Sequence, residues 1–379
     1  MRQMTRGICV AVAGVGTTPG GIAAVSRNLV QAIQSLPGTD GFLEVLSFLE
    51  RDTDRPNWLP QTVRFRGFEG RRLAFSAALF RRALWRRRFI FDHVTLVLPL
   101  LPLMATGWIR ASVLAHGSEA WRRIRRSSRW TFRYATVVLA NSEYTRERMR
   151  SHGVRGNIVA CPLGLASDVN LREFPPPPAE LPLLPAADGE MRRMSRRAFL
   201  LVGRMLASER EKGHDQLLMA LPLVHRRYPD AQLVFVGPGD DRERLAERSR
   251  GLGVAQAVFM PGFLSREALD RIYAAAYAYT MPSWQEGFGL VYLEAMNYAK
   301  ACLGCHNDGA ADVIVHGETG LLLDDPGDVA KLADALLHWL GNPQETMRMG
   351  RAGFERLHAH FTAKQYQMRL LSALRDHLP

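Results

Sequence analysis

Short apolar runs alternate with longer amphipathic segments along this chain of 379 residues. Apolar runs rich in β-branched and aromatic residues predict strands, and stretches with an apolar residue at every third or fourth position predict helices between them. The expected strands are residues 8–12, 43–48, 94–98, 113–114 and 137–140 in the first half, and 198–202, 232–236, 257–260, 277–281 and 301–304 in the second. This alternation predicts an α/β fold built on parallel sheets with helices on both faces.

A proline-rich segment separates the two series of strands. It reads Pro175-Pro176-Pro177-Pro178-Ala179-Glu180-Leu181-Pro182, and proline is excluded from the interior of a sheet. The chain is long enough for two hydrophobic cores. We therefore expect two Rossmann-like, doubly wound domains, residues 1–175 and residues 176–361, followed by a C-terminal helix of about residues 362–379.

The excess positive charge lies entirely in the first half. Residues 1–180 contain 26 Arg, no Lys and 13 Asp plus Glu, so their net charge is +13 out of a total of +12 for the chain. Arginine pairs between 71 and 88 are interleaved with Leu73, Phe80, Leu84 and Trp85, a pattern typical of helices that bind anionic lipid headgroups. The alternative is a solvated, arginine-rich helix.

Cysteine content and the apolar runs bear on location. Four cysteines form no dense framework, and the apolar run at 8–15 is short and leads directly into a glycine-rich loop, unlike a signal peptide. The run at 94–109 contains Pro99 and Pro102 and is shorter than the roughly 20 residues that span a bilayer. We expect a cytoplasmic protein, peripheral at the inner face of the membrane.

Two carboxylates flank a glycine-containing turn in the second half. The segment Glu286-Gly287-Phe288-Gly289-Leu290 precedes a helix that carries Glu294. Amide groups at a helix N-terminus bind anions, and glycines let a ligand approach the backbone. Carboxylates accept hydrogen bonds from sugar hydroxyl groups, which makes this a candidate sugar-nucleotide site. An ordinary helix start with acidic residues near its N-terminus is the alternative.

The same segment resembles the Glu-x7-Glu motif of the family 4 retaining glycosyltransferases, which have the two-domain GT-B fold. The resemblance implies a donor site made by Glu286, Gly287, Phe288, Gly289, Leu290 and Glu294, with Glu286 at the sugar and Glu294 at the ribose. It also implies that two sheet domains face each other across a cleft, with the C-terminal helix crossing back to the first domain.

Two cations follow the strand at residues 198–202. Gly203-Arg204 and Lys212-Gly213 are similar to the family's Gly-Arg and Lys-Gly pair, whose cations hold the diphosphate of the donor and neutralise the charge of the leaving nucleotide. The spacing between Arg204 and Lys212 is slightly longer than in the family, so Arg210 is a possible substitute for Lys212. Solvated charges in an ordinary loop are the alternative.

Four residues of the first half resemble positions of the family's site. Gly20 and Gly21 follow the first strand and resemble the family's N-terminal glycine loop, which approaches the sugar phosphate. His116 follows another strand and precedes a glycine, as does the family's histidine near the sugar and the acceptor. Ser142 resembles part of a family Ser-x-x-Thr segment, but it is equally suited to begin a helix as its N-cap.

The loop after residues 257–260 borders the nucleotide base in the family. Gly262 and Phe263 lie there, with Phe263 either against the base or packed in the core. Arg204, Lys212 and helix N-termini offer the positive charge that a divalent ion supplies elsewhere. We expect neither a metal nor a cofactor other than the nucleotide sugar.

These features predict a retaining, metal-independent hexosyltransferase. Its donor would be a nucleoside diphosphate sugar and its acceptor a lipid-linked molecule or a glycan, as in the biosynthesis of bacterial surface polysaccharides or glycolipids. A sugar-nucleotide epimerase or a phosphorylase of the same fold is the alternative enzyme. A basic nucleic-acid-binding protein is the alternative outside enzymes, although the sequence contains no standard groove-reading motif, and we expect no nucleic-acid partner.

Overall fold

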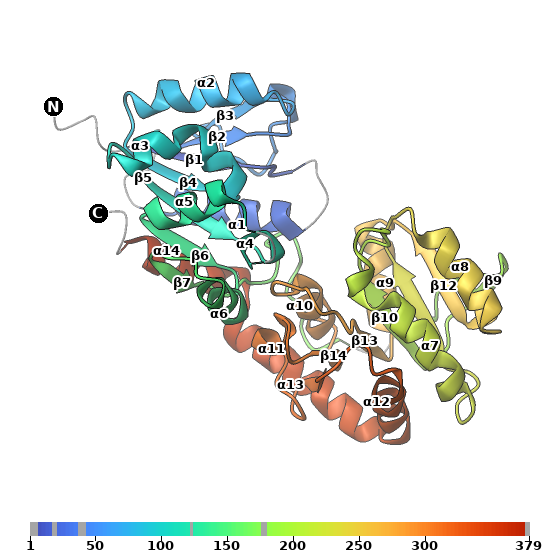
Figure 1. Ribbon diagram of the computed structural model, residues 1–379. Helices are drawn as coiled ribbons and strands as arrows, with labels where there is room; N and C mark the ends of the chain where they lie inside the picture. Colours follow the sequence, from blue (N-terminus) through green and yellow to red (C-terminus); the bar gives the residue numbers. More distant parts are fainter. Residues whose placement is uncertain (1–6, 17–20, 37–42, 122–123, 176–179, 376–379) are drawn as a thin grey trace. The chain divides into compact units, whose positions relative to one another are not determined.

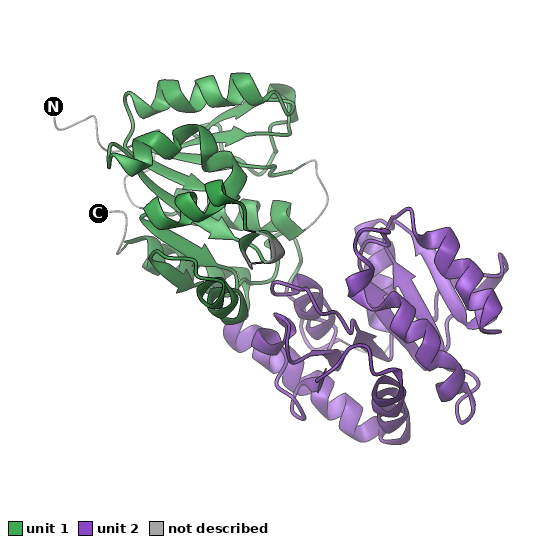
Figure 2. Cartoon of the chain, viewed as in Figure 1, with its two compact units in different colours: residues 1–170, 361–379 green, residues 171–360 purple. Residues whose placement is uncertain are grey.

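The computed structural model describes residues 7–16, 21–36, 43–121, 124–175 and 180–375. It divides into two compact units (Figure 2). Unit 1 comprises residues 1–170 and 361–379, and unit 2 comprises residues 171–360. The division therefore falls between Asn170 and Leu171, slightly before the proline-rich segment, of which residues 176–179 lie outside the described part of the chain.

Unit 1 is built on a seven-stranded parallel sheet with the order β3-β2-β1-β4-β5-β6-β7 (Figure 1). Its strands are β1 (Ile8–Val12), β2 (Leu43–Ser47), β3 (Arg64–Gly67), β4 (Arg88–Phe91), β5 (Arg110–Ala115), β6 (Val137–Ala140) and β7 (Ile158–Ala160). Its helices are α1 (Gly21–Gln34), α2 (Arg72–Ala83), α3 (Leu101–Ala105), α4 (Ser118–Trp121), α5 (Arg126–Tyr134), α6 (Glu143–Ser151) and α14 (Ala363–Arg375), with 3-10 turns η1 (Asp52–Asp54) and η2 (Val94–Leu100).

Unit 2 is built on a six-stranded parallel sheet with the order β12-β11-β10-β13-β14-β15. Its strands are β10 (Ala198–Val202), β11 (Gln232–Val236), β12 (Val258–Gly262), β13 (Ala278–Thr280), β14 (Cys302–Cys305) and β15 (Gly320–Leu323), and β8 (Leu183–Pro185) and β9 (Met191–Arg193) form a separate antiparallel hairpin. Its helices are α7 (His214–His225), α8 (Arg242–Gly251), α9 (Arg266–Ala275), α10 (Leu290–Met296), α11 (Ala310–Val313), α12 (Val329–Gly341) and α13 (Pro343–His360), with 3-10 turns η3 (Arg210–Lys212) and η4 (Ala255–Ala257).

The predicted strand at 94–98 is wrong. The strand lies earlier, at β4, whose residues Phe89, Ile90 and Phe91 are fully buried, and residues 94–100 form the turn η2. Pro99 and Pro102 lack the amide group that an interior strand donates to its neighbour, and the side chain of His93 accepts a hydrogen bond from the Thr95 amide at the start of the turn.

The C-terminal helix α14 packs in unit 1. Arg369 donates hydrogen bonds to the carbonyl oxygen of Pro162, the amide of Leu165 donates to the carbonyl of Phe361, and α14 contacts α1. A Cβ atom on Gly164 would lie 2.5 Å from the carbonyl oxygen of Thr362, so the chain approaches too closely for any side chain there. These contacts place the last helix beside the first one although most of the sequence separates them.

Each sheet contains one topological switch point, where the strand order reverses. It lies between β1 and β4 in unit 1 and between β10 and β13 in unit 2. Ligands of doubly wound sheets bind outside the carboxyl ends of the strands at such points, because the two loops there run in opposite directions and leave a crevice. Ligands are therefore expected to bind at the loops after β10, β13, β1 and β4.

Candidate active site

The turn that carries Glu286 follows β13 at the switch point of unit 2. The amide of Glu286 donates to Oδ2 of Asp308 at 2.9 Å, and the amide of Gly309 donates back to the carbonyl oxygen of Glu286 at 2.9 Å. A Cβ atom on Gly309 would lie 2.4 Å from the backbone of Gly287. The loop after β14 thus holds the backbone on both sides of Glu286 and fixes where its side chain begins.

Asp308 is a buried carboxyl group that the sequence analysis did not single out for the site. It is fully buried, and its two oxygens accept hydrogen bonds from the amides of Glu286 and Ala310. Burial, followed by the nearby charge of Glu286, raises the pKa of Asp308 to about 8. The amide hydrogen bonds and one from Ser283 act in the opposite direction because they stabilise the charged form.

Lys212 lies next to Glu286. Its Nζ atom is 3.7 Å from Oε2 of Glu286, and both side chains are about one-quarter exposed or less. The stem of Lys212 lies over Gly203, where a Cβ atom would be 3.1 Å from Cδ of the lysine. Gly213 has a φ of +90° and leaves no room for a side chain against Pro282. The close packing of these two loops brings the lysine to the acid.

The other two cations of this region have different partners. Arg204 is 62% exposed and forms an ion pair with Glu209. Arg210 forms an ion pair with Asp241 at 3.0 Å, and Asp241 is also bound by Arg244. Arg210 is therefore held by Asp241 at the start of α8. The geometry favours Lys212 over Arg210 as the partner of Glu286.

The second carboxylate, Glu294, lies on α10 and is largely shielded from solvent. Its Oε2 atom is 3.3 Å from the guanidinium of Arg266 on α9, which also binds Asp270. The helix begins at Leu290, directly after Gly289, whose φ of +85° places it against the ring of Tyr292. Phe288 is a core residue, 1% exposed, so only its backbone is suited to contact a donor.

Gly262 is the last residue of β12, and Phe263 follows it at the same edge of the sheet. Gly262 has a φ of +78°, and its carbonyl oxygen accepts a hydrogen bond from the amide of Gly237 in the loop after β11. Phe263 is 68% exposed, which rules out core packing as the reason for an aromatic residue there. An exposed ring beside glycine-rich loops is suited to stack on a planar base.

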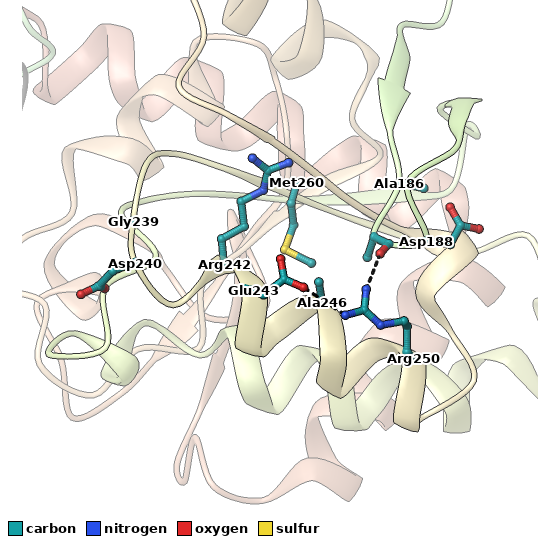
Figure 3. Close-up of a pocket in the computed structure, with 11 residues that line it drawn as sticks. Ala186, Asp188, Gly239, Asp240, Arg242, Glu243, Ala246, Arg250 and Met260 are labelled. Atoms are coloured by element: carbon teal, nitrogen blue, oxygen red, sulfur yellow. Dashed lines mark hydrogen bonds and ion pairs between the residues drawn. The ribbon is translucent and has the colours of Figure 1, made fainter.

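A cavity of about 550 Å³ lies beyond this loop, between the β8–β9 hairpin, α8 and β12 (Figure 3). Its lining includes Asp240, Arg242, Glu243, Arg250 and Met260. Glu243 and Arg250 pair with each other, and Arg250 donates to the carbonyl oxygen of Ala187 in the hairpin turn. The guanidinium of Arg242 lies near Gly262, where a Cβ atom would be 3.8 Å from it. The cavity is thus adjacent to the Phe263 loop and separate from Lys212 and Glu286.

The loop after β1, at the switch point of unit 1, is held by two buried carboxylates. Oε1 of Glu50, which follows β2, accepts from the amides of Val15 at 3.0 Å and Gly16 at 2.6 Å. Oδ2 of Asp92, which follows β4, accepts from the amide of Ala13 at 2.8 Å. Both side chains are at most 1% exposed. These amides are therefore saturated by the protein itself instead of facing an anion.

Asp92 also connects this loop to α1. The hydroxyl of Ser26 donates to the same Oδ2 atom at 2.6 Å, while Oδ1 has no partner among the described residues. Burial raises the pKa of Asp92 to about 6, against the effect of its hydrogen bonds and of His116. Gly21 is the exposed first residue of α1, and Gly20 lies outside the described residues.

His116 follows β5 and is oriented by three neighbours. Its Nε2 atom is 2.5 Å from the carbonyl oxygen of Asp92, its amide donates to Glu119, and its carbonyl accepts from Asn141. A ring nitrogen that faces a carbonyl oxygen must carry the proton, so Nδ1 of the neutral ring is the acceptor. Ser142 acts as the N-cap of α6, where its hydroxyl accepts from the Thr145 amide at 2.9 Å.

Neither a metal cluster nor a spanning helix is found in the described parts of the chain. No three His, Cys, Asp or Glu side chains there are grouped as metal ligands. None of the described helices has the length and apolar character needed to cross a bilayer.

Comparison with known proteins adds to this geometry. The family model described as glycosyl transferases group 1 matches residues 191–356, within unit 2. A GDP-mannose-dependent alpha-(1-6)-phosphatidylinositol monomannoside mannosyltransferase of Mycobacterium tuberculosis is 31% identical over 231 residues, which are 58% of this chain and 56% of that protein. The protein of the same name from Mycolicibacterium smegmatis is 30% identical over 279 residues, 70% of this chain and 65% of that protein. The chain thus spans less than two thirds of the length of these curated relatives.

Solved structures resemble the chain over almost its whole length. Sucrose-phosphate synthase from Thermosynechococcus elongatus has a TM-score of 0.76 at 21% identity, with 98% of this chain and 99% of that chain covered. HepE of Anabaena in complex with UDP-glucose also has a TM-score of 0.76, at 17% identity, with 97% and 99% covered. Residues 191–356 therefore match the glycosyl transferases group 1, and the chain as a whole has the predicted GT-B fold of two parallel-sheet α/β domains.

Proposed function

We propose that this protein is a glycosyltransferase that moves a hexose from a nucleoside diphosphate sugar to a hydroxyl group of a lipid-linked or glycan acceptor. The observation that carries the proposal is the pairing of Lys212 with Glu286 at the switch point of unit 2, on loops that Gly213 and Asp308 lock in place. The match of residues 191–356 to glycosyl transferases group 1 covers this same site.

The two cations would act on the diphosphate. Lys212, and Arg204 after exchange of Glu209 for a phosphate oxygen, would neutralise the charge that develops on the leaving nucleotide. They supply this charge without a divalent ion, so we propose that transfer is metal-independent. Glu286 would accept hydrogen bonds from hydroxyl groups of the sugar, and Glu294 from the ribose, where it would exchange part of its contact with Arg266.

We further propose that the anomeric configuration is retained by a front-face reaction. The bond between the anomeric carbon and the leaving phosphate oxygen breaks, the acceptor oxygen bonds to the same face, and the acceptor proton passes to that phosphate oxygen. Glu286 is paired with a cation and held through its backbone, which suits an acceptor of hydrogen bonds better than a nucleophile. His116, with Nδ1 available as an acceptor, would orient the sugar or the incoming hydroxyl.

For the donor we favour GDP-mannose. The two mannosyltransferases that use it are 30–31% identical to this chain, whereas the structure solved with UDP-glucose is 17% identical. The exposed ring of Phe263 would lie on the base.

A donor panel tests this proposal. A ligand that binds only the folded state raises the melting temperature by mass action. GDP and GDP-mannose are expected to raise it more than UDP, ADP and their sugars at equal concentration, and Lys212→Ala is expected to remove most of the shift. No shift with any nucleotide would contradict the proposal. Conversion of the donor to a free epimer, or its cleavage by inorganic phosphate, would favour the epimerase or phosphorylase alternative.

A further inference from the structure

Helix α2 is apolar on two opposite sides. Phe75, Ala78, Leu79 and Ala83 are buried against unit 1, as expected for a helix that covers a sheet. Leu73, Ala77, Phe80 and Leu84 lie on the other side at spacings of four, three and four residues, and we call them the outer stripe. Leu73 is 87% exposed, Phe80 45% and Leu84 64%. Figure 1 shows α2 at the edge of unit 1.

Two tryptophans extend the outer stripe at the C-terminal end of α2. Trp85 is 65% exposed and Trp108 is 47% exposed. The indole nitrogen of Trp108 donates to the carbonyl oxygen of Ala83 at 3.0 Å, which fixes it beside the helix, and the guanidinium of Arg87 lies 3.4 Å from the centre of its ring. Large contiguous apolar patches are rare on monomeric surfaces and mark sites of interaction.

The charge around the outer stripe is positive. Helix α2 contains no acidic residue, and the exposed Arg72 and Arg81 have no ion-pair partner among the described side chains. The nearby acids are already neutralised, Glu44 by Arg82 and Arg86, and Glu69 by Arg71. Leucine, phenylalanine and tryptophan next to arginine form the composition that lies in the headgroup region of an anionic bilayer.

The geometry points to α2 as a membrane-docking helix that inserts the outer stripe into an anionic lipid surface, with Arg72 and Arg81 on the headgroups. A second copy of the chain fits less well, because self-pairing through this face would bring its arginines together without any acidic partner. This inference goes beyond the proposed lipid-linked acceptor because it names the surface of the protein that contacts the membrane. It rests on the exposure and charge of side chains in unit 1 and not on the transfer chemistry in unit 2.

Binding to vesicles tests this surface. We expect the full chain to sediment with vesicles that contain phosphatidylglycerol, to bind pure phosphatidylcholine at least tenfold more weakly, and to lose affinity as salt is raised. Equal binding to both vesicles, or no binding to either at low salt, would overturn the inference.

Paired variants separate the outer stripe from general effects. Leu73→Ser with Leu84→Ser is expected to weaken binding at least tenfold, whereas Leu183→Ser with Met347→Ser, which changes two residues of unit 2 that are also exposed, leaves it within about twofold. Arg72→Glu with Arg81→Glu is expected to weaken it as much. Arg196→Glu with Arg226→Glu changes the net charge equally on unit 2 and has a smaller effect. The inference would be overturned if the serine substitutions in unit 1 and in unit 2 weakened vesicle binding equally, or if the glutamate substitutions in the two units did.

Two further readouts distinguish the causes of failure. Sedimentation without lipid reports the oligomeric state, and a dimer that the Leu73→Ser, Leu84→Ser variant dissociates would assign the stripe to a second copy and overturn the membrane role. Nucleotide release from soluble donor, without vesicles, is expected to be unchanged in that variant. Loss of vesicle binding with normal nucleotide release concerns the surface alone, whereas vesicle binding by a wild-type chain that releases no nucleotide contradicts only the proposed transfer.

Discussion

The side chain of Asp308 accepts a hydrogen bond from the backbone amide of Glu286 at 2.9 Å, between two loops that are 22 residues apart in the sequence. Glu286, the residue proposed to hold the sugar, is therefore positioned by a residue that does not itself need to contact a sugar. This relationship suggests that loss of Asp308 affects turnover through Glu286.

Asp308→Ala is expected to lower kcat about a hundredfold, because displacement of a reacting group by about 1 Å costs a factor of that order. Two buried amides lose their acceptor, so the free energy of unfolding should also fall by about 1–3 kcal/mol. Steady-state kinetics and urea unfolding measure the two effects. The matched control is Asp324→Ala, directly after β15, whose side chain is 80% exposed and which should change neither. A kcat within threefold of wild type would contradict the positioning role.

Lys212 and Arg210 offer a second comparison. Lys212→Ala should reduce kcat at least a hundredfold, since it removes a cation beside Glu286 and the expected diphosphate. Arg210→Ala should keep most of the activity, because its guanidinium is occupied by Asp241. The assay is release of nucleotide at saturating donor. If Arg210→Ala is the more damaged enzyme, the assignment of these two cations is reversed.

Much of this site follows from the sequence because its residues stand directly after strands. The apolar runs at β10 and β13 locate the loops that hold Arg204 and Glu286, and parallel strands bring those loops to one edge of the sheet. The loop with Lys212 follows in the same way. These positions depend on the local pattern of apolar residues and on sheet topology, and both can be predicted from a single sequence.

Other residues were not predictable from local pattern. Three buried acids, Glu50, Asp92 and Asp308, accept hydrogen bonds from backbone amides that are 22 to 79 positions away in the sequence. A lone acid in a sequence carries no sign of such a partner. The strand β4 was missed for a different reason. Its first residue, Arg88, is the last of a run of three arginines, whereas the longer apolar run after it contains Pro99 and could not enter the sheet.

Glu50 is expected to hold the loop after β1 through its oxygens. Glu50→Ala should lower the free energy of unfolding by about 1–3 kcal/mol, because the amides of Val15 and Gly16 and the hydroxyl of Ser47 lose their acceptor. Glu50→Gln keeps one carbonyl oxygen for both amides and should restore most of the loss. Urea unfolding of both variants checks this, with the exposed Glu147→Ala as control. An equal loss in the Ala and Gln variants would argue against the amide contacts.

The raised pKa of Asp92 predicts that the stability of the fold depends on pH. Its pKa rises from the usual 3.8 to about 6 in the folded chain, so the folded state binds this proton more tightly than the unfolded state. The stability that it contributes is present below pH 3.8 and is lost as the pH rises through about 6. Asp92→Asn stays neutral and keeps an oxygen for Ala13 and Ser26. The difference in unfolding free energy between wild type and this variant should therefore shift in favour of the variant from about pH 4 to about pH 7, measured by urea unfolding. A difference that is constant across this range would contradict the assignment.

The most direct test of the central claim is nucleotide release by the wild-type chain and by Glu286→Ala, with GDP-mannose as donor and a bacterial lipid extract as acceptor. The account predicts slow release without acceptor and faster release with it, a mannosylated product of retained configuration, and at least a hundredfold loss in Glu286→Ala without loss of folding. Release that is unchanged in Glu286→Ala, or no release from any nucleotide sugar with any acceptor, would contradict it.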